Sequence, residues 1–274
     1  MSEACAGEGI VALTNVETIA DYLQTLAPTD LAATWDNVGL LLGDREAPVR
    51  RVMTCLTVTG DSVAEAIEGE ADLVVSHHPL PFRPLQRITK DTPEGRYLLD
   101  LAHAKIALYS AHTAFDSAAR GINQRIAEGL ELRNIEPLVV KEDDATLGSG
   151  RYGEAESPIT SAELGERLKK FLGIESLRLV GAVDRSFTRI GIACGSAGSY
   201  LEPATECECE ALVTGETTFH TCLAAEAQDV VLLLTGHFAS ERFALERLAE
   251  EMDKAFADVQ VWASKREKDP LQLI

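Results

Sequence analysis

Strand-like and helix-like patterns alternate along almost the whole chain. Apolar, β-branched runs at 50–59, 71–78 and 105–113 are each followed by a stretch with helical spacing. The alternation continues in the second half, where the strand patterns at 208–216 and 229–237 each precede a helical stretch. Chains with this pattern fold into layers of helices packed on sheets, so we expect an α/β fold.

Several helix starts can be predicted from their capping residues. Thr92, followed by Pro93, is typical of the position just before a helix. Thr160 and Glu163 have the spacing of a capping box, in which each side chain bonds the backbone N–H of the other residue. We expect Asp61 to cap the helix that follows the first predicted strand.

The length of 274 residues predicts two domains or lobes. Residues 141–158 are polar and glycine-rich, which is typical of a junction. We therefore predict an α/β lobe 1 at 1–140, a junction at 141–158 and an α/β lobe 2 at 159–274, whose C-terminal tail is able to return to lobe 1.

The chain is strongly acidic. Its 25 Lys and Arg against 44 Asp and Glu give a formal net charge of −19. Such a charge repels phosphate backbones and anionic membranes, so we expect no nucleic-acid partner and no membrane association. An anionic substrate would need a local positive charge, such as a bound metal.

The sequence also predicts a cytoplasmic protein, because it has no apolar stretch long enough to span a membrane and no signal-peptide pattern at its N-terminus. The six cysteines are then expected to be reduced thiols. Cys207 and Cys209 form a C-x-C pair. Zinc would require a second pair, so a structural role is favoured over metal binding.

Five of the six histidines lie at or just after predicted strand ends, where open α/β sheets bind ligands. His77 and His78 are adjacent, and in a continuing strand their rings would point to opposite faces. Pro79 ends the strand, so the chain can turn and bring both rings to one site. The alternative is one histidine in the core and the other exposed.

His112 with Asp116 and His237 with Glu241 repeat one arrangement. In each pair an apolar strand leads to a histidine, and a carboxylate follows four residues later. If the chain is helical after Gly236, the second pair lies on one helix face, a turn apart. The alternatives are a helix-capping role for Asp116 and a solvated helix face for Glu241.

Together, three histidines and two carboxylates form a ligand set for divalent cations. Five protein ligands are too many for one catalytic ion with an open position, and they suit two ions bridged by a carboxylate and a water. Zinc, iron and manganese all accept such ligands. The two ions would form a local positive pole that attracts a small anionic substrate.

A resemblance to a known family is carried by eight blocks, which occur in order along nearly the whole chain. The blocks are WDNVGLLLGD (35–44), VVSHHPLPFRPLQRIT (74–89), SAHTAFDSAARGIN (110–123), GSGRYGE (148–154), CGSAGS (194–199), TGETTFH (214–220), TGHFASERFALERLAEEM (235–252) and the terminal DPLQLI. They resemble the Nif-three-like dinuclear metal centre proteins, which are also known as GTP cyclohydrolase I type 2 homologues.

The resemblance implies a fold of two interlinked α/β lobes with a dinuclear metal site at strand C-terminal ends in the cleft. It implies a toroidal homohexamer whose metal sites face the inner cavity. Matching the motifs places the metal ligands on His77, His78, Asp116, His237 and Glu241, with Glu241 as the bridging carboxylate.

His112 and His220 also lie in family motifs and are the candidates for a catalytic role, either by orienting the ligands or by contacting substrate. The chain resembles the short form of the family, without a CutA-like middle domain. TGETTFH has one histidine where many relatives have two in succession.

The family's activity is hydrolytic opening of the GTP imidazole ring at C8 by a metal-activated water, with release of formate and dihydroneopterin triphosphate as product. The resemblance thus implies a small anionic substrate such as a nucleotide. Arg83 and Arg87 are the nearest basic residues for its phosphates, and the alternative for both is an exposed loop charge. Other functions remain open: a metal-dependent phosphoesterase or amidohydrolase, or a non-enzymatic metal-binding hexameric scaffold for protein partners.

Overall fold

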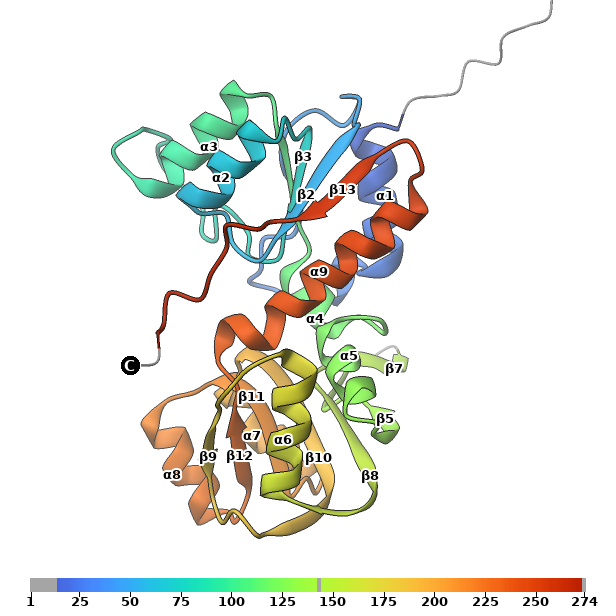
Figure 1. Ribbon diagram of the computed structural model, residues 1–274, viewed down its shortest axis with the longest axis vertical. Helices are drawn as coiled ribbons and strands as arrows, with labels where there is room; N and C mark the ends of the chain where they lie inside the picture. The colour runs from blue at the N-terminus through green and yellow to red at the C-terminus, as the bar shows by residue number, and fades with distance from the viewer. Residues whose placement is uncertain (1–13, 142–143, 273–274) are drawn as a thin grey trace, which may run out of the picture.

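Two β-sheets, each covered by helices, make up the computed structural model, which describes residues 14–141 and 144–272. The sheets lie one above the other in Figure 1, and the long helix α9 (His237–Ala255) runs between them. The α/β fold predicted from the alternating pattern, with two interlinked lobes, is therefore confirmed.

Within the described residues, the first sheet has five strands in the order β1-β4-β3-β2-β13. These are β1 (Gly39–Leu42), β2 (Arg51–Cys55), β3 (Leu73–Ser76), β4 (Ala107–Ser110) and β13 (Gln260–Ala263). All neighbours are parallel except β1, which runs antiparallel to β4. The helices associated with this sheet are α1 (Val16–Leu26), η1 (Thr29–Leu31), α2 (Gly60–Glu68) and α3 (Pro93–His103).

The second sheet, in the same described ranges, has six strands in the order β5-β8-β10-β11-β12-β9. These are β5 (Arg133–Glu136), β8 (Arg151–Thr160), β9 (Arg178–Val180), β10 (Ser186–Ser196), β11 (Ala211–Glu216) and β12 (Val231–Leu234). The central strands β10, β11 and β12 are parallel, and the outer ones are antiparallel to their neighbours. A separate ladder joins β6 (Val139–Lys141) to β7 (Asp144–Ser149).

The remaining helical elements are α4 (His112–Ser117), α5 (Ile122–Gly129), α6 (Ser161–Leu172), η2 (Gly198–Tyr200), α7 (Leu201–Glu206) and α8 (Phe219–Ala227). No helix in the described part of the chain is long and apolar enough to cross a membrane.

Alternate side chains along the strands enter different cores, as the two-residue period of a strand requires. In the first sheet, Val52 and Val75 enter a central core that includes α9, while Met53 and Val74 pack with α2 and α3. The inner face of the second sheet joins the same central core, and its outer face packs with α7 and α8. One continuous core therefore joins both sheets through α9 and fixes their relative position.

The chain crosses between the sheets more than once. β5 pairs with β8 of the second sheet although it lies within 1–140, the range that we assigned to lobe 1. Near the C-terminus, β13 pairs in parallel with β2 and so lies in the first sheet. Strand pairing over long sequence separations decides this membership, and no local pattern in the sequence encodes it.

The range 141–158, predicted to be a glycine-rich junction, contains β7 and most of β8. The first half of β8 is hard to detect because its buried positions hold Arg151, Gly153 and Ala155 instead of β-branched residues. Gly150, with φ +63°, makes the turn between the two strands in a conformation that favours glycine. The range that we predicted to be a junction therefore consists largely of strand residues.

Most predicted helix starts are observed. Thr92 caps α3, and the Thr160–Glu163 capping box is formed at the start of α6. The expected cap at Asp61 is wrong, because α2 begins at Gly60 and is capped by Thr59, whose side chain accepts from the backbone of Ser62. The threonine is in extended conformation one residue before the helix, which is the geometry that a cap requires.

Candidate metal centre

Three parallel strands of the first sheet end side by side. Cys55 of β2 pairs with Ser76 of β3, and Ser76 pairs with Ser110 of β4, so the residues after each strand meet at one edge. His77 and His78 follow β3 directly. Because carboxyl ends of parallel strands are the usual ligand-binding edge, this register brings the histidine pair to the place where a site is expected.

The other parts of the site come from helices that begin at this edge. Asp116 lies on the short helix α4, which follows β4, and His237 and Glu241 lie on the first turns of α9. Asp116 is inside its helix, so the alternative of an N-terminal cap is wrong. Glu241 is buried, so the alternative of a solvated helix face is also wrong for it.

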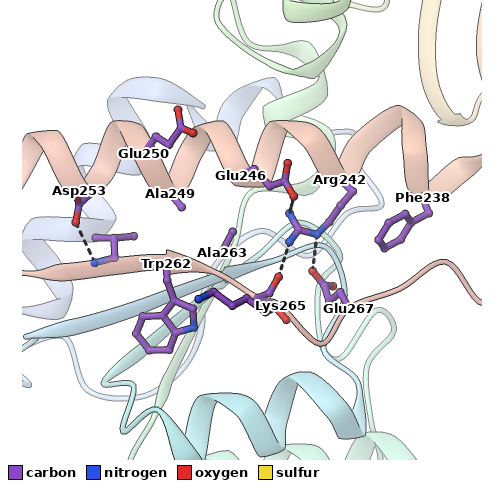
Figure 2. A pocket seen from close by; sticks show the side chains of 12 residues that line it. Phe238, Arg242, Glu246, Ala249, Glu250, Asp253, Trp262, Ala263, Lys265 and Glu267 are labelled. Carbon is purple, nitrogen blue, oxygen red and sulfur yellow. Dashed lines mark hydrogen bonds and ion pairs between the residues drawn. The ribbon is translucent and has the colours of Figure 1, made fainter. Parts of the chain in front are cut away.

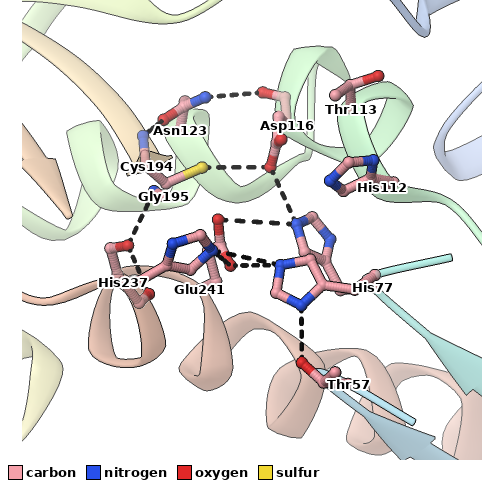
Figure 3. A network of polar contacts seen from close by, with 12 residues as sticks. Thr57, His77, His112, Thr113, Asp116, Asn123, Cys194, Gly195, His237 and Glu241 are labelled. Carbon is pink, nitrogen blue, oxygen red and sulfur yellow. Dashed lines mark hydrogen bonds and ion pairs between the residues drawn. The ribbon is translucent and has the colours of Figure 1, made fainter. Parts of the chain in front are cut away.

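The structure brings all five predicted ligands together (Figure 3). His77 Nε2 lies 3.6 Å from Asp116 Oδ1 and 3.8 Å from Glu241 Oε1. His78 Nε2 and His237 Nε2 each lie 3.2 Å from Glu241 Oε2, and the two nitrogens are 3.3 Å apart. The Glu241 carboxylate thus has one oxygen toward His77 and the other toward the remaining two rings.

Some of the possible metal-binding atoms in this cluster lack hydrogen-bond partners. Both ring nitrogens of His77 and the Oε2 atom of Glu241 are buried without a hydrogen bond. His78 and His237 already use Nδ1, for Thr57 and Glu216 respectively, which leaves their Nε2 atoms facing Glu241. Buried polar atoms of this kind require a partner.

A divalent cation would fit between these atoms. Two ligands of one tetrahedral zinc, each about 2.0–2.1 Å from the ion, stand about 3.3 Å apart. The three separations among His78, His237 and Glu241 are 3.2, 3.2 and 3.3 Å. On the other side of the carboxylate the spacing is wider, because His77 Nε2 lies 3.8 Å from Glu241 Oε1 and 3.6 Å from Asp116 Oδ1. The residues present therefore fit a divalent cation at this cluster.

The electrostatics of the cluster also favour a cation. Burial lowers the pKa of His77 to about 3, so this ring is neutral and offers its lone pair. Burial, together with the charge of Glu241, raises the pKa of Asp116. Burial opposes ionisation of Glu241, but the surrounding histidines, His77 foremost, hold its pKa below the usual range. Two carboxylates that repel each other in a buried site are stabilised when a cation lies between them.

His237 contacts the Glu241 carboxylate through its Nε2 atom. The Glu241 carboxylate beside the ring raises the pKa of His237 to about 9, against the opposing effect of burial. A proton on this ring occupies the position that a metal would take, so metal binding would release it.

The ligands are held by side chains behind them. Thr57 Oγ1 lies 2.7 Å from Nδ1 of His78, and Glu216 Oε1 lies 2.9 Å from Nδ1 of His237. The Cys194 thiol donates to Oδ1 of Asp116 at 3.1 Å. Such contacts fix the ring orientation and the tautomer of metal-binding histidines.

His112 is the first residue of α4 and belongs to the site. One of its ring nitrogens can approach those of His77 and His78 as part of a three-histidine group. Its Nδ1 lies 2.7 Å from Asp36 Oδ1. Burial lowers the pKa of His112, but this bond and the nearby carboxylates together outweigh burial and raise it. Its backbone φ of +28° is strained for a non-glycine residue, which is typical of functional positions.

His220 is placed differently from the prediction. It is exposed on the first turn of α8 beside Phe219, and among the described residues it is in neither group of converging ligand atoms. In the same TGETTFH block, Glu216 at the end of β11 is the residue that contacts His237. The block thus contributes a carboxylate to the site, and the prediction named its histidine.

Sequence reasoning missed several residues that hold the site, namely Asp36, Thr57, Cys194 and Glu216. Three of them lie beside residues that mark a position in the sequence. Asp36 follows one of the two tryptophans of the chain, and Cys194 and Glu216 are next to glycines near strand ends. A polar residue next to a glycine at the carboxyl end of a strand was the available clue.

Cys207 and Cys209 are not part of any group of three or more possible ligands in the described residues. Cys209 is buried in the core on the outer face of the second sheet, in agreement with a structural role. The cysteines of the described part are free thiols.

Glycines leave room for the acidic ligand. Gly195, at φ +67°, lies so close to Glu241 that a Cβ atom there would be 2.2 Å from Oε1. Gly215, on the neighbouring strand β11, would place a Cβ atom 3.0 Å from the Cα atom of His237. The start of α9 therefore packs directly on the backbones of β10 and β11.

The C-terminal segment contacts the residues after β2 and the helix that carries Glu241, and Figure 2 shows its Glu267 beside Arg242. Glu267 accepts hydrogen bonds from the backbone N–H groups of Leu56 and Thr57, at 2.9 and 2.8 Å. Its carboxylate also lies 3.1 Å from Nε of buried Arg242, the residue after Glu241. These contacts border a groove of about 540 Å³ between α9 and β13. The groove has several exposed carboxylates but no converging set of ligand atoms among the described residues, so we place the candidate site at the histidine cluster.

Arg151, in the GSGRYGE block, fixes the helix that carries Asp116. It is buried, and its guanidinium donates to the carbonyls of Ser117 and Ala118 at the end of α4, at 2.9 and 3.1 Å. It also donates to the carbonyls of Gly148 and Gly150, at 2.7 and 2.6 Å.

We expect Arg151→Met to lower the free energy of unfolding by roughly 3 kcal/mol or more, because it leaves several buried carbonyls without donors. Urea unfolding followed by circular dichroism measures this change. Arg151→Lys, which keeps the charge with fewer donors, should lie between wild type and Arg151→Met. A loss below about 0.5 kcal/mol for Arg151→Met, the range of ordinary surface changes, would contradict the assignment.

Comparison with known proteins places the chain in a family. Residues 14–270 match the family model described as Duf34/NIF3 (NGG1p interacting factor 3). A protein of Clostridium perfringens named GTP cyclohydrolase 1 type 2 homolog is 33% identical over 257 residues, covering 93% of this chain and 98% of its own length. The Protein NIF3 homolog of Schizosaccharomyces pombe is 33% identical over 260 residues, covering 88% of this chain and 91% of its own.

Solved structures agree with this placement. The Staphylococcus aureus protein SA1388 superposes with a TM-score of 0.86 at 25% identity, covering 95% of this chain and 99% of its own. A Bacillus cereus protein related to NIF3 has the same fold, with a TM-score of 0.85 at 22% identity over 96% of this chain and 100% of its own. A family match over residues 14–270 and relatives at 33% identity over most of their length lead to one conclusion: the chain belongs to the Duf34/NIF3 family.

Proposed function

We propose that the chain is a metal-dependent hydrolase that binds two divalent cations, such as zinc, iron or manganese, in the histidine cluster. One observation carries the proposal: His77, His78, Asp116, His237 and Glu241 converge in a partly buried site, where both ring nitrogens of His77 and the Oε2 atom of Glu241 lack hydrogen-bond partners. When bound, such cations supply Lewis acidity and make water a nucleophile near neutral pH.

In this proposal, His112 acts as the general acid that transfers a proton to the substrate. Asp36 holds its Nδ1, so the other ring nitrogen is the one free to exchange a proton with substrate. Burial lowers the pKa of His112, but the bond to Asp36 and the surrounding carboxylates raise it overall, so the ring is able to carry a proton near neutral pH. His112 is therefore the residue that we assign to protonation of the leaving group.

The substrate that we propose is GTP, opened at C8 of its imidazole ring with release of formate. The name of the Clostridium perfringens relative supports this choice. Arg83 and Arg87 are exposed in the loop that follows His77 and His78, where they could meet the phosphates.

We further propose a cytoplasmic homohexamer without nucleic-acid or membrane partners, on the basis of the family resemblance and the net charge of −19.

Turnover of GTP tests the proposal. Metal-loaded protein should release formate and form a fluorescent pterin product. We expect His112→Gln to reduce the rate by about 10²- to 10⁴-fold, the usual contribution of general acid–base catalysis, with metal content unchanged. Glu250→Gln, an exposed change on α9, serves as the control and should leave the rate unchanged.

Other outcomes identify the alternatives. Hydrolysis of phosphoesters or amides, with GTP unreacted, would identify a phosphoesterase or amidohydrolase. If no compound of such a panel is turned over while metal stays bound, the hydrolase is excluded and a metal-binding scaffold takes its place. Loss of metal in His112→Gln would make His112 a ligand and remove it from the proton-transfer role.

A further inference from the structure

Two exposed aromatic side chains stand beside the metal centre. Trp35 is 63% exposed and Phe82 is 47% exposed. Their ring centroids are 5.8 Å apart, and they lie 6.0 and 5.8 Å from the His112 ring. Large aromatic side chains are among the most favourable groups to bury, so two exposed ones in contact suggest a surface that a ligand covers.

Polar contacts hold the two aromatic loops in place. Asp36, next to Trp35, bonds His112 and the backbone N–H of Thr113. The side chain of Asn37 donates to the carbonyl of Pro81 at 2.8 Å, directly before Phe82. The loops are thus joined to each other and to the start of α4, which limits the movement of both rings and lowers the entropy lost on binding.

The aromatic pair is continuous with the cluster through His112. The His112 ring lies 5.2 Å from the His77 ring and 5.6 Å from the His78 ring, measured between centroids. Trp35 and Phe82 therefore border the His112 ring, the group that we assign to proton transfer. Neither aromatic residue has a role in the proposed proton transfer or in binding the phosphates.

We propose that Trp35 and Phe82 form a stacking subsite for a planar heteroaromatic ring of the substrate, such as a purine. Stacking on aromatic side chains accepts any ring with a π-face and contributes about 1–3 kcal/mol per base. The location of the reacting atom rests on the proposed hydrolase function. The binding of the ring does not, so the two can fail separately.

Trp35 itself can report binding. The chain has two tryptophans, so in a Trp262→Phe background the tryptophan fluorescence comes from Trp35 alone. We expect guanosine, which carries no phosphate, to quench this signal saturably. Tripolyphosphate and ribose 5-phosphate should leave it unchanged, because they have no aromatic ring.

Variants separate stacking from other effects. Phe82→Leu should weaken guanosine binding by about 5- to 150-fold, as expected for the loss of one stacking partner. Trp35→Leu, measured by calorimetry, should do the same. Phe219→Leu removes an aromatic ring that is 71% exposed on α8 and serves as the matched control without effect. All variants should retain their metal content.

Each result decides the proposal. Saturable quenching by guanosine that depends on Phe82 supports the subsite even if GTP is never hydrolysed, which would refute only the proposed reaction. If GTP is hydrolysed and both variants keep the wild-type KM, the subsite is refuted and the hydrolase stands. If Trp35→Leu and Phe82→Leu change the oligomeric mass without changing guanosine affinity, the pair is a contact between copies and the proposal is overturned.

Discussion

Replacing Glu241 with glutamine is expected to abolish most metal binding. The carboxylate lies between two sets of ligands, with Oε1 toward His77 and Oε2 toward His78 and His237. Its loss removes the one group that touches both, and it also removes a negative charge that a buried cation requires. Elemental analysis should find about two divalent ions per chain in wild type, as two-metal sites require, and far fewer in Glu241→Gln.

Thermal unfolding gives a second measure of the same change. A ligand that binds only the folded state stabilises it by about 2.7–4.1 kcal/mol at 100 to 1,000 times its dissociation constant. Adding zinc to metal-free wild type should therefore raise the melting temperature, whereas Glu241→Gln should respond weakly. Circular dichroism of the metal-free proteins checks that the variant folds.

Glu250→Gln is the matched control on the same helix. Its carboxylate is exposed, so metal content and the zinc-induced stabilisation should equal those of wild type. If Glu241→Gln binds two ions as tightly as wild type, Glu241 is not a ligand. If wild type binds one ion or none after gentle preparation, the dinuclear proposal fails, even if Glu241→Gln binds less metal than wild type.

The sequence allowed much of the site to be predicted because its parts follow strand ends. His77 and His78 come directly after β3, and His237 begins the helix after β12. A strand followed by a polar residue and a helix is a local pattern, and parallel strands bring such positions to one edge. The family resemblance then selected the same residues.

The contacts between distant segments could not be predicted in this way. Asp36 bonds His112 across 76 positions, and Glu267 bonds Thr57 across 210. Each contact depends on which strands pair and in what register. The identity of a single residue does not reveal that pairing. The same reason explains why the sequence did not reveal that β5, inside the range of lobe 1, pairs with β8, or that Arg151 is buried against the end of α4.

Gly195→Ala is expected to weaken metal binding by at least about tenfold, through a contact that involves no ligand substitution. The added Cβ would stand 2.2 Å from Oε1 of Glu241, well inside contact distance, so the carboxylate must move away from His77. Gly195 also has a φ of +67°, and a side chain there would be strained independently of Glu241. The experiment has to separate these two effects.

Gly173 provides the control, because its φ of +68° is nearly the same and a Cβ there meets nothing within 4 Å. Both alanine variants should lose about 1 kcal/mol of stability from the left-handed backbone. Metal affinity, titrated with zinc against a chelator of known affinity, should fall in Gly195→Ala and stay at the wild-type value in Gly173→Ala. Equal affinities in the two variants would mean that Glu241 moves without consequence, and the glycine at the end of β10 would then serve the backbone turn alone.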